Sequence, residues 1–301
     1  MTTRAWMAFA ALGLIWGLPY FFIKIALQEL SPLVVAWGRL ALAALILLPV
    51  AWRRGALGTL SRHWGAITAF ALVEFVIPFS AISLGERWIS SSVTGILIAL
   101  VPLTVVVISR CFALHEPLSF WRGVGLAVGL LGVIALLGFG TVTGSLAWAG
   151  VGCMLLATIG YATGPLIVQR YMTGLESIGP VAASVGVATL VLTLPAALSF
   201  PRHWPGATVL IALLVLGAVC TALAMLLMVY LIRSAGAARA SVITYINPAV
   251  ATLLGVIVLN EHLGLGGMLA FGLILLGSWL STRGDARAVN AGAQELVHER
   301  C

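Results

Sequence analysis

Apolar stretches of about twenty residues recur along the whole chain, and short segments rich in glycine, proline and arginine separate them. A helical stretch of this length spans a hydrocarbon core of roughly 30 Å. The alternation of apolar and polar residues that is typical of barrel strands is absent. The pattern predicts ten membrane-spanning helices, over residues 5–27, 32–52, 64–84, 89–111, 120–139, 146–169, 178–198, 207–232, 238–259 and 266–282.

The composition agrees with a protein whose surroundings are the lipid bilayer. Hydrophobic residues make up 61% of the 301 residues and charged residues only 8%, whereas a soluble domain carries roughly 25% charged residues. This leaves too little polar surface to coat a soluble globule. We therefore expect an all-α integral membrane protein without a separate soluble catalytic domain.

The basic residues indicate how the chain is oriented in the membrane. With the N-terminus in the cytoplasm, twelve arginines fall at the cytoplasmic ends of the predicted spans, against Arg87 and Arg202 at the outer ends. This asymmetry is the positive-inside bias of membrane proteins. We expect a multi-pass protein of the cytoplasmic (inner) membrane with both termini in the cytoplasm. The net charge of +7 then reflects topology, and no nucleic-acid partner is expected.

The two halves of the chain share a pattern of motifs. Pro102 in the fourth predicted span precedes Glu116 in the following loop, and Pro248 in the ninth span precedes Glu261 in the same way. Such self-similarity indicates a duplicated unit. Because each unit holds five spans, the second copy would cross the membrane in the opposite direction, as in many transporters. The predicted division is a first repeat over 1–144, a second, inverted repeat over 145–282 and a cytoplasmic tail over 283–301.

The order of short motifs along the chain is similar to that of a known family. They are Ile15-Trp16-Gly17, Lys24, Ser31-Pro32, Trp37-Gly38-Arg39, the stretch from Glu74 to Ile77-Pro78-Phe79, and the two Pro-to-Glu segments. The chain resembles the EamA-type members of the drug/metabolite transporter superfamily. The resemblance implies a basket of ten helices around a central cavity. It also implies export of amino acids, their derivatives, or cationic and drug-like compounds.

Glu74 is the most informative polar residue, since it lies about 15 Å from either end of the third predicted span. An ionised side chain at mid-bilayer costs roughly 2.5 to 3.5 kcal/mol. Glu74 is therefore expected to face a cavity or a partner. It could form a structural ion pair with Arg39, whose axial offset is about 5 Å, or it could bind a cationic group or a coupling proton. Both interpretations stay open.

Several other residues within the predicted spans suit the wall of a polar cavity. Trp16 falls at mid-depth, whereas nine other tryptophans fall near the membrane interfaces, where aromatic belts are usual. The predicted substrate-binding set is Trp16, Tyr20, Arg39, Glu74, Tyr161, Tyr245 and Asn247. The alternative for each aromatic residue is core packing or a helix–helix hydrogen bond without any substrate.

Prolines and small residues within the spans indicate where helices bend or approach closely. Proline removes a backbone donor and clashes with the preceding turn, which kinks a helix. The candidate hinges are Pro19, Pro78, Pro102, Pro165 and Pro248, with static bending as the alternative. Glycines four residues apart in the fifth span favour close helix packing. The protein is expected to be a monomer or a homodimer.

These features predict a secondary transporter of small metabolites, most of all amino acids or related compounds, that works by alternating access, and the family resemblance implies that it is an exporter. The candidate coupling ion is the proton. One alternative is efflux of cationic drugs or toxic compounds by proton antiport. An intramembrane enzyme is a weaker alternative, because HExxH and comparable constellations are absent and no histidine lies within a predicted span. A channel is disfavoured because no ring of charges is evident. We expect no cofactor and no metal.

Overall fold

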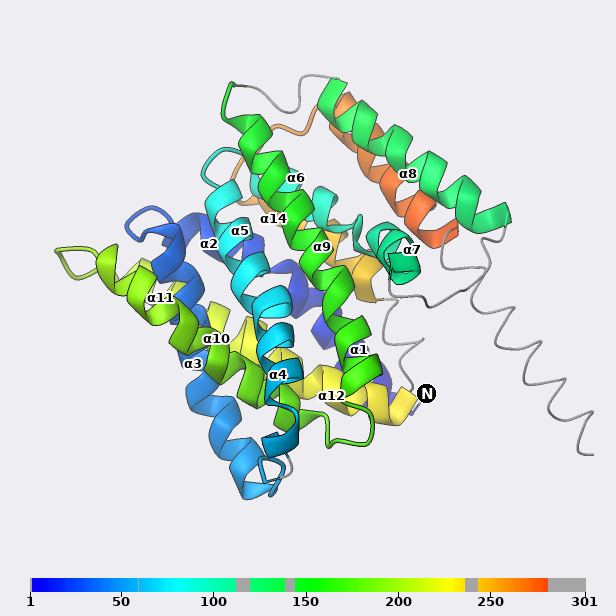
Figure 1. The fold of residues 1–301 in the computed structure, drawn as a ribbon. Helices are drawn as coiled ribbons and strands as arrows, with labels where there is room; N and C mark the ends of the chain where they lie inside the picture. The colour runs from blue at the N-terminus through cyan, green and yellow to red at the C-terminus, as the bar shows by residue number, and fades with distance from the viewer. Residues whose placement is uncertain (1, 59, 112–119, 139–143, 236–242, 281–301) are drawn as a thin grey trace, which may run out of the picture.

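The computed structural model describes residues 2–58, 60–111, 120–138, 144–235 and 243–280, and the regular structure within these ranges is entirely helical (Figure 1). Eight helices are long and apolar enough to cross a membrane, and two shorter apolar helices, Ile246–Ile257 and Leu265–Leu280, follow them. Each of the ten overlaps one predicted span, which confirms the all-α, multi-span prediction. Glu116 and the predicted tail lie outside the described residues.

Several spans of the first half consist of more than one helical segment. The segments are α1 (Thr3–Gly17) and α2 (Pro19–Ala26), α3 (Pro32–Arg53), the 3₁₀ turn η1 (Leu60–Arg62), α4 (Trp64–Phe70), the π-helix η2 (Ala71–Val76), α5 (Ile77–Gly85), α6 (Ser91–Ile98), α7 (Val101–Cys111) and α8 (Phe120–Gly138). The third span is therefore α4, η2 and α5 in continuous succession, with a π-helical turn at its centre.

The second half repeats this organisation in part. Its segments are α9 (Ala147–Tyr171), α10 (Ile178–Leu198), α11 (Ala207–Leu214), the π-helix η3 (Val215–Leu223), α12 (Ala224–Ala235), α14 (Ile243–Ile257) and the helix Leu265–Leu280. The eighth span, like the third, thus carries a π-helix between two α-helical parts. π-helical turns are rare and often occur at functional sites.

Local sequence signals explain where α3 and α6 begin. The Ser31 side chain accepts a hydrogen bond from the Val34 amide at 3.4 Å, and Pro32 occupies the first helical position of α3. Ser90 caps α6 through the Val93 amide in the same way. Serine at the cap and proline just inside it are the residues that favour a helix start.

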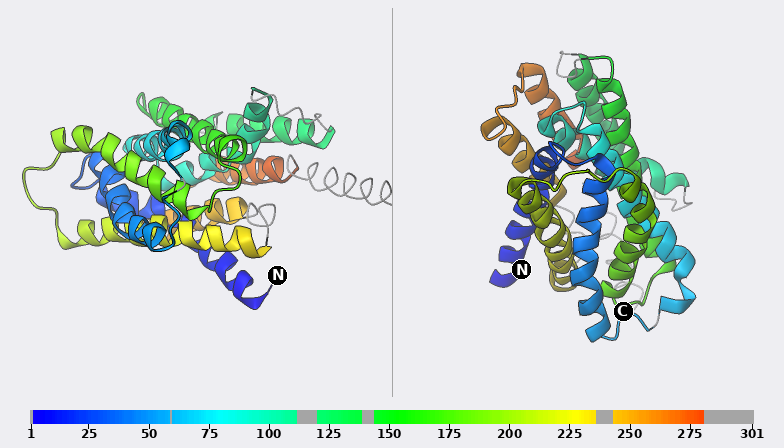
Figure 2. Two further views of the ribbon diagram at one scale, coloured as in Figure 1. Left: turned by 60° about the horizontal axis from the view of Figure 1, so that its bottom comes forward. Right: turned by 90° about the vertical axis from the view of Figure 1, so that its left-hand side faces the viewer.

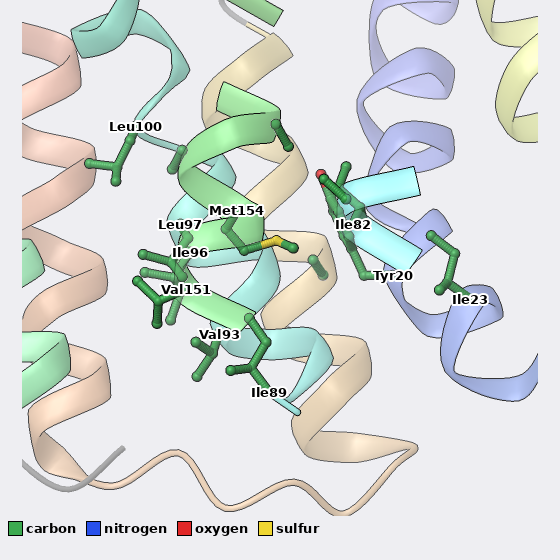
Figure 3. Close-up of a cluster of buried hydrophobic side chains, with 14 of the residues drawn as sticks. Tyr20, Ile23, Ile82, Ile89, Val93, Ile96, Leu97, Leu100, Val151 and Met154 are labelled. Carbon is green, nitrogen blue, oxygen red and sulfur yellow. The ribbon is translucent and has the colours of Figure 1, made fainter. Parts of the chain in front are cut away.

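Small residues allow the helices to cross at short distances. Gly85 of α5 lies against Gly150 and Met154 of α9, and a Cβ atom at Gly95 of α6 would contact the Ala251 side chain of α14. One large apolar cluster fills the space between these helices (Figure 3). Close approach through small residues is the usual packing mode of membrane helices.

The fifth and tenth spans pair with each other. α8 and the helix Leu265–Leu280 run side by side at one edge of the molecule (Figure 1). A Cβ atom at Gly277 would lie 2.6 Å from the Gly125 carbonyl oxygen and 2.5 Å from the Gly129 nitrogen. The glycine spacing of the fifth span thus serves a contact within the chain.

The predicted hinge prolines occupy two kinds of position. Pro19, Pro78 and Pro102 stand at the start of a new helical segment, after a break or a π-helix. Pro165 and Pro248 lie inside the continuous helices α9 and α14. Pro19 and Pro102 therefore lie at interruptions of a span and Pro78 lies directly after a π-helix, and the role of all five prolines as hinges stays a prediction.

Candidate functional site

Arg39 lies buried in the middle of α3, with 6% of its surface exposed. Its Nε donates a hydrogen bond to Thr221 Oγ1 at 2.7 Å, and its Cζ lies 3.8 Å from the centroid of the Phe79 ring. The Thr221 hydroxyl in turn donates to the Leu216 carbonyl, five residues earlier, at 2.8 Å. The π-helix η3 therefore positions the acceptor that orients the guanidinium, and a cation–π contact holds its face.

Glu74 lies in the π-helix η2 at the centre of the third span and is half-buried. Its Oε2 is enclosed and has no hydrogen-bond partner among the described residues. Gly164 of α9 faces this oxygen, and a Cβ atom there would also lie 3.2 Å from the Phe70 ring. An enclosed oxygen without a partner is unusual, which marks Glu74 as a candidate binding group.

The predicted ion pair between Glu74 and Arg39 is not formed in this structure. Across the described part of the chain, the ion pair that meets the distance criterion is Arg233–Glu176, at 3.2 Å and well exposed. Arg39 instead turns toward Thr221 and Phe79. The axial offset expected from the sequence does not determine the direction in which a side chain points around its helix, and here the guanidinium and the carboxylate do not meet.

Two tyrosines complete a polar centre, which we define as Tyr20, Arg39, Glu74 and Tyr161. Tyr161 of α9 interacts electrostatically with both Arg39 and Glu74, and Tyr20 of α2 does so with Tyr161 and Arg39. Within the described residues no hydrogen bond occupies either hydroxyl or the terminal guanidinium nitrogens. These groups remain available to a ligand.

The other predicted site residues lie elsewhere. Trp16 packs in a separate apolar cluster with residues of α12, including Leu227. With its amide nitrogen turned toward α1, Asn247 donates to the Gly13 carbonyl at 3.2 Å and to the Ile243 carbonyl at 3.1 Å, so it joins α14 to α1. Tyr245 belongs to α14, but its side chain lies outside the described residues.

Glu261, in the loop after α14, accepts four hydrogen bonds from the N-terminus of α6. The donors are Ser91 N (2.7 Å), Ser91 Oγ (2.9 Å), Ser92 N (2.9 Å) and Ser92 Oγ (2.6 Å). A carboxylate at a helix N-terminus satisfies free amides and the helix dipole. The helix that Glu261 caps lies about 170 residues earlier in the sequence. We name this set of contacts the Glu261 latch.

Glu86 and Lys24 form a second feature at the same end of the molecule, which sequence reasoning missed. Glu86 follows α5 and is 1% exposed, and neither carboxyl oxygen has a hydrogen-bond partner in the described chain. Lys24 Nζ donates to the backbone carbonyls of Glu86 and Ile89. The short turn after α5 has the sequence of a surface loop, so nothing in it indicates a buried carboxyl group. The signal that could have indicated it is Lys24, a cation within an apolar span at the same depth.

The opposite, arginine-rich end of the molecule is hollowed. α1 and α12 meet at this end (Figures 1 and 2). Side chains of these two helices line a recess of about 440 Å³, and a second recess of about 310 Å³ lies beside it. Both share Tyr230. The first is lined by Arg4, Met7, Ala8, Ala11, Leu227 and Tyr230, and the second by Arg54, Leu226, Val229, Tyr230 and Arg233.

Apolar helices of spanning length around buried charged and hydroxyl groups define the class of multi-pass membrane proteins. The model of the EamA-like transporter family matches residues 4–138 and again residues 148–283. The chain belongs to this family, and it is a multi-pass protein of the inner membrane.

Similar proteins are also named as transporters. The chain is 28% identical over 283 residues to the uncharacterized inner membrane transporter YedA of Escherichia coli, covering 92% of this chain and 90% of that protein. It is also 28% identical over 288 residues to an uncharacterized transporter of Archaeoglobus fulgidus, covering 93% and 99%. A protein crystal structure with 17% identity matches 96% of this chain and 99% of its own with a TM-score of 0.68, which shows the fold alone.

Proposed function

We propose that this protein exports amino acids or closely related metabolites across the inner membrane by alternating access. The observation that carries the proposal is the polar centre, where an acidic and a basic side chain lie in mid-span without pairing with each other. Charged groups inside a membrane protein mark substrate or ion pathways. Membership of a transporter family fits the same conclusion.

A zwitterionic ligand matches the charges of the polar centre. The terminal nitrogens of Arg39 offer the paired donors that recognise a carboxylate, and the enclosed Oε2 of Glu74 offers an acceptor for an ammonium group. The Tyr161 hydroxyl interacts electrostatically with both charges, and the Tyr20 hydroxyl with Arg39. An amino acid would therefore satisfy groups that have no hydrogen-bond partner of their own among the described residues.

One end of the molecule is closed and the other is recessed, as expected for one state of an alternating-access cycle. The Glu261 latch ties the loop after α14 to α6 at one end, while recesses open at the arginine-rich end. With both termini in the cytoplasm, this state faces inward. The two matches of the family model and the π-helices in the third and eighth spans support inverted repeats over 1–144 and 145–282.

Efflux of organic cations by proton antiport is the second candidate function. The observation that favours it is the surroundings of Glu74, where a carboxylate lies beside Phe70 and near Tyr161. Aromatic rings next to an acidic group suit a lipophilic cation. Arg39 disfavours this function, because a second cation in the same centre would repel the ligand.

Binding to the purified protein tests the proposal. We expect at least one radiolabelled member of a panel of threonine, methionine and aromatic amino acids to bind the parent protein. Glu74→Gln should weaken that binding at least tenfold, and the control Glu29→Gln, at an exposed carboxylate, should leave it unchanged. Binding of tetraphenylphosphonium without any amino acid would favour the second function. Equal affinity in the parent and Glu74→Gln would remove Glu74 from the site.

A further inference from the structure

Glu86 is a charged residue with an unusual environment. Its side chain is 1% exposed, it directly follows α5, and both carboxyl oxygens lack a hydrogen-bond partner in the described chain. The negative end of the α5 dipole disfavours an anion there. A buried carboxylate without hydrogen bonds is costly, whereas a neutral carboxyl group is much less so. The geometry therefore fits a carboxyl group that holds a proton.

The neighbouring cation does not neutralise Glu86 directly. Lys24 Nζ donates to the backbone carbonyls of Glu86 and Ile89, and no ion pair joins the two side chains in this part of the structure. The charged and titratable groups that face Glu86 or its helix end are Lys24 and Tyr20 from α2, Arg39 from α3, Cys153 from α9 and Glu261 from the loop after α14. Burial has the largest influence and favours a neutral Glu86, Lys24 and Arg39 favour the charged carboxylate, and Glu261 adds a like charge that favours the neutral form.

A proton suits this position better than a metal ion does. A hard metal cation is held by several oxygen ligands, and the described residues contain no group of three acidic, histidine or cysteine side chains that could hold one. The surroundings are apolar and close-packed, with Ile82, Ile89 and Met154 in one cluster (Figure 3). A proton needs neither a cavity nor further ligands.

Glu86 is also connected to the polar centre. It interacts electrostatically with Tyr20 and Arg39, and these two interact with Tyr161, which interacts with Glu74. The Glu261 latch closes the same end of the molecule above α6. A change of charge at Glu86 therefore alters the electrostatic environment of both the Glu261 latch and the polar centre.

We propose that Glu86 is the proton-carrying carboxyl of the transport cycle and that it is protonated in this latched state. When the Glu261 latch is open, water at that end of the molecule gives a proton to the Glu86 carboxylate, an O–H bond forms, and the pairing of the carboxylate with Lys24 ends. After the latch has closed over the neutral carboxyl, the O–H bond breaks and the proton passes to water that enters from the opposite end, so that one proton crosses the membrane in each cycle. This inference rests on the proposed transport function, and it assigns ion coupling to Glu86 rather than to Glu74.

Infrared difference spectroscopy of the purified, reconstituted protein tests the proposal without any substrate. The C=O stretch of a protonated carboxyl is distinct from carboxylate bands, and at neutral pH exposed acids do not contribute to it. We expect the parent to show this band, Glu86→Gln to lose a component of it and Glu29→Gln to keep it in full. Glu86→Asp, which retains a carboxyl group, should shift the component and keeps the test valid if Glu86→Gln does not fold.

Access to the carboxyl provides a second readout. The Ser91→Ala/Ser92→Ala double variant removes the two hydroxyl donors of the latch and should speed deuterium exchange at the Glu86 band at least severalfold. A parent spectrum without the band, or one that Glu86→Gln and Glu86→Asp leave unchanged, would overturn the proposal. An ionised Glu86 in a protein that binds amino acids would leave the proposed function standing. A protonated Glu86 in a protein that binds none of them would leave only this inference standing.

Discussion

Replacing Glu261 by alanine removes the acceptor of four hydrogen bonds, and the structure sets the size of the effect. The Ser91 and Ser92 backbone amides lie 2.7 and 2.9 Å from the carboxylate, and amides in the first turn of a helix have no acceptor within the helix. Each buried donor left unpaired costs about 1–3 kcal/mol. We expect the free energy of unfolding to fall by about 3 kcal/mol in total.

Thermal unfolding followed by tryptophan fluorescence measures this loss. An unfolding entropy of about 2.1 cal/mol/K per residue over 301 residues converts about 3 kcal/mol into a decrease of about 5 °C in the midpoint. The control is Glu29→Ala, whose carboxylate accepts one hydrogen bond from the Gly206 amide at 2.7 Å at an exposed position. It should shift the midpoint by about 1 °C. Equal shifts for the two variants would refute the assignment of Glu261 as a stabilising latch.

Three further substitutions test individual contacts by the same assay. Thr221→Val leaves the buried Nε–H of Arg39 without its acceptor and should cost about 1–3 kcal/mol. Gly277→Ala places a Cβ atom against the backbone of α8 and should also cost about 1–3 kcal/mol, because the backbone cannot move aside. Lys24→Met removes the donor to two carbonyls at the end of α5 and should cost about 1.5–3 kcal/mol.

Each of these substitutions has a matched control elsewhere in the chain. Thr193→Val removes an acceptor of Trp37 Nε1 at an exposed position, Gly272→Ala adds a Cβ atom with nothing within 4 Å, and Arg233→Met breaks an exposed ion pair. Surface changes of this kind stay within about 0.5 kcal/mol. A test variant that behaves like its control would show that the contact in question contributes no stability.

The spans were predictable because membrane thickness fixes the length of an apolar helix. The segmentation of those spans was only partly predictable. Pro19 and Pro102 each stand where a span breaks into two helical segments, since proline has a direct steric effect on the backbone. The π-helices η2 and η3 have no such residue signature, because one extra residue in a helical turn depends on tertiary packing.

The sequence indicated the depth of the candidate site residues in the membrane, but it did not indicate which face of its helix each residue occupies. Glu74, Arg39 and Tyr161 were singled out because polar groups in an apolar span are costly, and they do lie in one region. Trp16 was chosen by depth alone, yet it packs on the α12 side, since depth does not determine which face of a helix a residue occupies. Glu86 was missed because its burial results from packing around a short turn.

Transport of radiolabelled threonine, methionine and aromatic amino acids into proteoliposomes tests the central claim most directly. It should be measured with and without a pH gradient, for the parent, Glu74→Gln and the control Glu29→Gln. We expect uptake of at least one amino acid by the parent and the control, and a decrease of tenfold or more in Glu74→Gln. Unchanged uptake by Glu74→Gln, or no uptake of any member of the panel by the parent, would contradict the account.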